Sequence, residues 1–126
     1  MKIAVASSGT DLGSEVSRFF GRAPYFMIVE MKDGDIESSE VIENPSASAS
    51  GGAGIKTAQI ISNSAVEAVI ASAPGLNAFE VLKELGIKIY RAADASVEEN
   101  IRLFTEGNLE RYDQQAVAVA GEEDRH

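Results

Sequence analysis

Cysteine is absent from this chain of 126 residues, and its single histidine is the last residue, His126. Without cysteine there is no disulfide, no thiolate ligand for a metal ion and no cysteine nucleophile. Without an internal histidine there is no imidazole to serve as the base of a serine hydrolase, although several serines are present. The sequence therefore argues against metal centres built from soft ligands and against nucleophilic hydrolases.

Positive charge is also scarce, because 11 lysine and arginine residues stand against 20 aspartate and glutamate residues and leave a formal net charge of −9. The basic residues are scattered, so we expect neither nucleic acid nor a membrane surface as a partner. No apolar run approaches the roughly 20 residues needed to cross a bilayer. The chain enters a strand pattern at once, with no room for a signal peptide. These absences predict a cytoplasmic protein.

The residues that are present are typical of one α/β domain. An apolar share of 44% and a charged share of 25% are ordinary for a globular protein, and the length is sufficient to bury a core. We predict a domain over residues 1–112 and a flexible acidic tail over 113–126. Within this tail the small-residue run 116–120 could pair with a partner.

Five strands are predicted from short apolar or alternating runs. They cover residues 2–6, 25–31, 36–43, 67–71 and 87–91. An Asp-Gly turn at 33–34 joins the second and third strands into a hairpin, and the polar character of the third suits the edge of a sheet.

Four helices are predicted between these strands. Helical spacing indicates a brief helix within 12–20, ended by Gly21, and another over 55–61. Two further helices begin at capping pairs and end at glycines. The pairs are Asn77 with Glu80 and Ser96 with Glu99, and the glycines are Gly86 and Gly107.

This order of elements predicts a mixed five-stranded sheet with helices on both faces, a three-layer α/β/α fold. In such sheets a ligand binds beyond the carboxyl ends of the parallel strands. We expect the serine-rich turn 7–9, the turn 72–77 and the glycine loop 44–54 to meet there.

The loop 44–54 consists almost entirely of small residues, so it cannot help to build a core. Its value lies in backbone freedom and in backbone N–H groups. The helix that follows would direct its unpaired N–H groups and positive dipole end into the loop, an arrangement that binds anions. The alternative interpretation is a flexible connection.

Arg22 lies between Gly21 and Pro24, where the backbone is restricted on one side and free on the other. A positioned guanidinium suits a carboxylate, a phosphate or an anionic cluster. The alternative interpretation is a surface arginine that pairs with one of the many acids.

The sequence does not match standard nucleotide-binding or catalytic motifs. Thr57 replaces the third glycine of a dinucleotide fingerprint, and Ile55 separates Gly54 from Lys56 in the Walker pattern. The first strand carries no acid, which argues against a two-metal nuclease. The sequence contains no clear catalytic constellation, which favours a binding protein over an enzyme.

Five motifs in this order resemble the dinitrogenase iron-molybdenum cofactor biosynthesis family, over about residues 1–113. They are FGRAPYF at 20–26, IENP at 42–45, GGAGI at 51–55, PGLNA at 74–78 and GIKIY at 86–90. The resemblance implies a ribonuclease H-like fold and a non-enzymatic carrier or chaperone. The implied cargo is an iron-sulfur or molybdenum-containing cofactor precursor, and the implied partners are cofactor-biosynthesis proteins.

The resemblance and the strand-end crevice together give a set of cofactor-binding candidates. They are Ser8, Gly21, Arg22, Asn44, Gly51, Gly52, Gly54, Gly75 and Asn77. Many family members have a histidine just before the Phe-Gly-Arg motif, where this chain has Phe19. An anionic cluster would thus be held by N–H groups, Arg22 and hydroxyls rather than by cysteine or an internal histidine. The alternative is a module that binds a small anion or phosphometabolite without metal.

Overall fold

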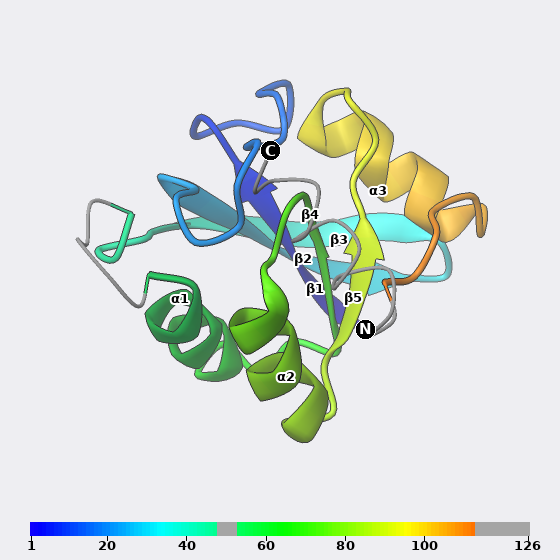
Figure 1. Ribbon diagram of the computed structural model, residues 1–126. Helices are drawn as coiled ribbons and strands as arrows, with labels where there is room; N and C mark the ends of the chain where they lie inside the picture. The colour runs from blue at the N-terminus through cyan, green and yellow to red at the C-terminus, as the bar shows by residue number, and fades with distance from the viewer. Residues whose placement is uncertain (48–52, 113–126) are drawn as a thin grey trace.

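The computed structural model describes residues 1–47 and 53–112 (Figure 1). The predicted tail 113–126 and residues 48–52 of the glycine loop lie outside this part of the chain. Within it there are five strands and three helices: β1 (Lys2–Ser7), β2 (Tyr25–Lys32), β3 (Asp35–Glu43), α1 (Ala53–Ser62), β4 (Ala68–Ala71), α2 (Leu76–Glu84), β5 (Lys88–Arg91) and α3 (Val97–Thr105). All five predicted strands are confirmed. Among the described residues, no helix has the length and apolar character needed to cross a membrane.

The strands form one mixed sheet in the order β3-β2-β1-β4-β5. The central strand β1 pairs antiparallel with β2 and parallel with β4. The hairpin of β2 and β3 turns at Asp33 (φ 54°) and Gly34 (φ 84°), two left-handed residues of the kind that a tight hairpin requires. The mixed sheet and the edge position of β3 are therefore as predicted.

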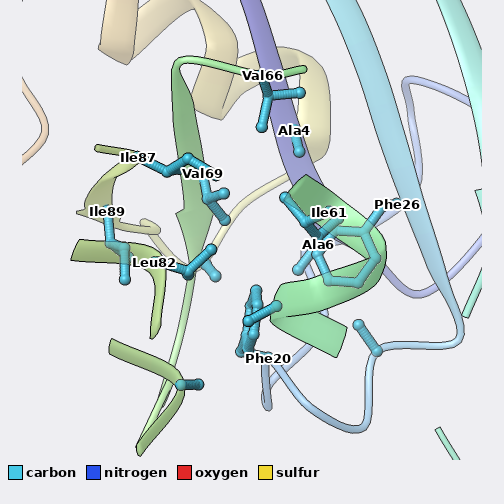
Figure 2. Packing of buried hydrophobic residues seen from close by; sticks show 14 of the residues in the cluster. Ala4, Ala6, Phe20, Phe26, Ile61, Val66, Val69, Leu82, Ile87 and Ile89 are labelled. Atoms are coloured by element: carbon cyan, nitrogen blue, oxygen red, sulfur yellow. The ribbon is translucent and has the colours of Figure 1, made fainter. Parts of the chain in front are cut away.

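Successive residues of a strand point to opposite faces of a sheet, and here both faces are covered. Ala4 and Ala6 of β1 lie in the cluster that α1 and α2 cover, whereas Ile3 and Val5 lie in the cluster that α3 covers. Figure 2 shows the first cluster, in which Ile61 of α1 lies near Phe26 and Ala6. The predicted arrangement of helices on both faces is confirmed.

The predicted helix within 12–20 is wrong. Its backbone instead bonds to other parts of the chain: the Val16 N–H donates to the Ala95 carbonyl at 3.1 Å, and the Ser17 N–H donates to the Ala6 carbonyl at 3.1 Å. Phe19 is 54% exposed while Phe20 is completely buried, so these two neighbours do not share one apolar face. Tertiary hydrogen bonds thus outweigh the helical spacing of the apolar residues.

One of the two predicted helix caps is also wrong. Helix α2 begins at Leu76 and has Gly75 as its N-cap, without a side-chain cap, which leaves Asn77 exposed in the first turn. Ser96 does cap α3, because its Oγ accepts a hydrogen bond from the Glu99 N–H at 3.1 Å. Gly86 and Gly107 follow the ends of their helices as predicted, and both adopt the left-handed conformation at φ 76°.

Candidate functional site

The start of α1 is packed tightly against the turn that precedes β2. A Cβ atom added to Gly21 would lie 2.9 Å from the backbone nitrogen of Gly54 and 3.2 Å from the carbonyl carbon of Ala53. Such a contact is too short for any residue with a side chain. Glycine at position 21 therefore allows the Phe-Gly-Arg turn to lie directly on the first turn of α1.

Asn44 holds the same turn from the other side. Its side chain is 5% exposed, and its amide nitrogen donates to the Ala23 carbonyl at 2.9 Å and to the Thr57 hydroxyl at 3.1 Å. Its amide oxygen accepts a hydrogen bond from the Ser46 N–H at 3.1 Å. Because these contacts occupy the amide on both sides, Asn44 positions the turn, the start of the loop and α1 relative to one another.

The first turns of α1 and α2 meet in space, as their neighbouring positions in Figure 1 indicate. A Cβ atom added to Gly54 would lie 3.3 Å from the Ala78 side chain and 3.7 Å from the Pro74 carbonyl oxygen. Gly75, at φ 75°, adopts a backbone conformation that favours glycine and begins α2. The two N-termini thus lie side by side, next to the Gly21 turn.

Neither N-terminus carries an acid in its first turn, although 20 of the 126 residues are acidic. The contrast is α3, whose first turn contains Glu98 and Glu99 and is capped by Ser96. Acids in a first turn offset the partial positive charge of a helix N-terminus. No acid offsets that charge in the first turns of α1 and α2, and in α2 no side chain caps the N–H groups.

Charged side chains on α3, which covers the other face of the sheet, form a network of their own. A hydrogen bond from Arg102 lowers the pKa of the exposed Glu99 carboxyl, and the pKa of Arg102 is raised by hydrogen bonds to Glu99 and Glu106. The Arg102 guanidinium also bonds to Glu106 at 2.8 Å. This network stabilises the outer surface of α3 and lies outside the candidate site.

Arg22 lies on the surface beside this site, on the turn that Gly21 begins. One guanidinium nitrogen donates to the carbonyl of Ala47, a residue of the glycine loop, at 3.2 Å. The side chain thus spans from the Gly21 turn to the glycine loop. Its position allows the guanidinium to face an anion bound near the start of α1.

The structure brings most of the described candidates together, though in different roles. Gly21, Gly54 and Asn44 form the packed support, Arg22 lies at its rim, and Gly75 begins the adjoining helix. Asn77 is exposed in the first turn of α2. Gly51 and Gly52 lie outside the described residues.

Ser8 is held elsewhere, within the segment that follows β1. Its hydroxyl and its N–H both donate to the Glu15 carbonyl, at 2.8 and 2.9 Å. No recorded contact of Ser8 within the described residues reaches the Gly21 turn or the start of α1. The structure therefore does not bring Ser8 to the other candidates.

A groove of about 350 Å³ lies beyond the carboxyl ends of β4 and β5, where the topology predicts a ligand crevice. Ser72 and Asp94 line it, together with Arg18 and Phe19. The groove adjoins the Gly21 turn, because the Phe20 N–H donates to the Ser72 carbonyl at 3.0 Å. Sequence reasoning missed Arg18 and Phe19 as lining residues because it assigned their segment to a helix.

Metal ligands do not gather in the described part of the chain, where no group of three or more histidine, cysteine, aspartate or glutamate side chains could hold a metal ion. The donors near the site are the N–H groups in the first turns of α1 and α2 and the Arg22 guanidinium. Such donors fit an anion as a whole rather than a bare cation. A metal cluster would fit here only through its anionic outer atoms.

Known proteins are similar to this chain in sequence and fold. A family described as dinitrogenase iron-molybdenum cofactor matches residues 1–107. The uncharacterized protein MJ0580 of Methanocaldococcus jannaschii is 41% identical over 113 residues, which cover 90% of this chain and 92% of that protein.

Two solved structures are also similar. The NMR structure of a candidate NifB protein from Thermotoga is 44% identical, with a TM-score of 0.74, and the match covers 87% of this chain and 91% of that one. The apo form of the orange protein from Desulfovibrio gigas is 29% identical, with a TM-score of 0.80, and the match covers 88% and 92% of the two chains. The motifs, the fold and these matches agree, and the chain belongs to the dinitrogenase iron-molybdenum cofactor family.

Proposed function

We propose that this protein is a non-enzymatic carrier or chaperone of an anionic iron-sulfur or molybdenum-containing cofactor precursor. Family membership indicates a part in the biosynthesis or binding of the iron-molybdenum cofactor. The proposal also includes a cytoplasmic location, a single ribonuclease H-like domain over residues 1–112, and cofactor-biosynthesis proteins as partners. The cargo is bound and passed on, so no catalytic residue is assigned.

The observation that carries the proposal is the pair of adjoining, acid-free N-termini of α1 and α2 beside Arg22. In a chain with a net charge of −9, this is a local surface that attracts anions. Gly21 and Asn44 keep the turn fixed on α1, so the N–H groups point in a defined direction. The names of two relatives, a candidate NifB protein and an orange protein with an apo form, agree with a bound cofactor.

Anaerobic reconstitution tests the proposal directly. The protein is incubated with iron, sulfide and molybdate, desalted, and measured by elemental analysis and absorption spectroscopy. We expect stoichiometric metal with a visible chromophore. A desalted protein that holds no stoichiometric metal would count against the carrier function.

Asn77→Asp separates binding from folding. An aspartate in the first turn of α2 favours the helix through its dipole, while its charge repels an anionic cargo. We expect unchanged or raised thermal stability together with a several-fold loss of bound metal. Gln59→Glu, which adds the same charge on an exposed position of α1, should load normally. Equal metal loading of both variants would show that the helix N-termini are not part of the binding site.

The absence of a metal-ligand set among the described residues favours a second candidate function, the binding of a small anion or phosphometabolite without metal. This function predicts that inorganic phosphate raises the melting temperature of the metal-free protein. Arg22→Ala should remove the increase, whereas Lys32→Ala, at the hairpin end of β2, should keep it. A phosphate effect without metal loading would favour this second function.

A further inference from the structure

A cationic pocket lies away from the candidate site, at the other end of α2. It has a volume of about 460 Å³, and three basic side chains line it: Lys83, Lys88 and Arg111. None of its lining residues is acidic. Within the described residues, none of the three cations takes part in a recorded ion pair. The pocket is thus a positive region on a strongly acidic protein.

Apolar groups complete this cationic pocket. Ile87, Ile89 and Tyr112 contribute to its lining. Leu85, which lies between two lining residues in sequence, is 53% exposed, a high value for a large apolar side chain. A suitable occupant therefore has an apolar part and an anionic part.

The path of the backbone beside β5 leads toward this pocket. The Arg91 N–H donates to the Glu110 carbonyl at 2.7 Å, and the Tyr112 N–H donates to the Ile89 carbonyl at 2.9 Å. Residues 110–112 thus run antiparallel along the outer edge of β5, from its end toward its beginning. The next residue of β5 in this direction is Lys88, which lines the pocket.

The sequence that follows Tyr112 has the required two parts in order. Residues 116–120 read AVAVA, and residues 122–124 read EED. We propose that the segment 116–124 of the same chain occupies the cationic pocket, with its apolar part against the apolar lining and its acids beside Lys83, Lys88 and Arg111. Because the segment begins four residues beyond Tyr112, which is itself a lining residue, the tether makes its effective concentration high.

Disulfide trapping tests this inference cleanly, because the full chain has no cysteine of its own. The double variant Leu85→Cys with Gly121→Cys keeps the three cations and the three acids. The control, Ser39→Cys with Gly121→Cys, places the first cysteine on β3 at the opposite edge of the sheet. Mass spectrometry after timed oxidation and alkylation measures the intramolecular disulfide in each dilute sample.

We expect the Leu85 pair to close about tenfold faster than the Ser39 pair, as a preferred position of a tethered segment implies. The advantage should shrink in about 1 M salt, where charges are screened within roughly 3 Å, and when Lys83→Glu and Arg111→Glu are added. Equal closure rates for the two pairs would overturn the inference. Disulfide-linked dimers that increase with protein concentration would also overturn it, because the segment would then occupy a second copy.

Discussion

At the scale of single residues, Gly21 stands out among the described glycines because an added Cβ would meet backbone rather than a side chain. Gly21→Ala would bring a methyl group within 2.9 Å of the α1 backbone, and backbone cannot move aside as a side chain can. We expect the free energy of unfolding to fall by about 1–3 kcal/mol, the usual cost of overpacking. Urea denaturation followed by circular dichroism measures this change.

Gly13→Ala is the matched control for this substitution. The atom recorded near an added Cβ there is the Asp11 carboxylate oxygen, at 3.3 Å, the free end of a flexible side chain. We expect the free energy of unfolding of this variant to lie within about 0.5 kcal/mol of the value for the original protein. If Gly13→Ala and Gly21→Ala lower the free energy of unfolding by the same amount, the close packing of the turn on α1 does not limit stability.

The sequence singled out Gly21 and Asn44 but did not reveal how they act. The motif resemblance placed both in a binding region, whereas the structure gives them contacts that hold the turn on α1. Asn44 reaches Ala23 and Thr57, residues on different elements, and no local spacing encodes such contacts. The sequence pattern thus singled out residues that lie together in the fold. It did not indicate the contacts that each of them makes, and their part in binding stays a prediction.

At the scale of elements, substitutions at the two predicted helix caps should change stability differently. Ser96→Ala removes the hydroxyl that accepts from the Glu99 N–H, so we expect a loss of about 1 kcal/mol. Asn77→Ala removes no cap, because Asn77 lies inside the first turn of α2 and is exposed. Its thermal midpoint should stay the same or rise slightly, since alanine favours helix. A greater loss from Asn77→Ala than from Ser96→Ala would contradict this assignment.

Strands and hairpin were predictable because their signals are local. Alternation, β-branched residues and the Asp-Gly turn all lie within a few residues of one another. The segment 12–20 was not predictable in this way, because its backbone bonds to Ala95 and Ser72, which lie far away in the sequence. Its apolar residues Leu12 and Val16 do pack against the core, but from a segment of turns and isolated bridges. The predicted cap of α2 was wrong as well. Asn77 and Glu80 have the spacing of a capping pair, but no side chain caps the helix.

At the scale of the whole molecule, net charge should determine how thermal stability depends on salt concentration. The chain carries a formal net charge of −9, and the ion pairs of Arg91 and Arg102 engage three of its acids. Self-repulsion of this kind opposes the compact state and is screened by salt. We expect the melting temperature to rise by a few degrees between about 0.01 and 0.15 M sodium chloride. This rise corresponds to roughly 1 kcal/mol in the free energy of unfolding. Calorimetry at constant pH measures it, and a melting temperature that falls with salt would contradict it.

The central position of β1 has a consequence for how the chain assembles. β1, β2 and β3 pair as an antiparallel unit whose contacts lie close in sequence, whereas β1 meets β4 only after the hairpin and α1 have intervened. Closing that long loop is entropically costly, and such pairings form slowly. During synthesis one edge of β1 therefore waits, apolar and unpaired, until β4 has emerged from the ribosome. During that interval the unpaired edge exposes the nascent chain to aggregation.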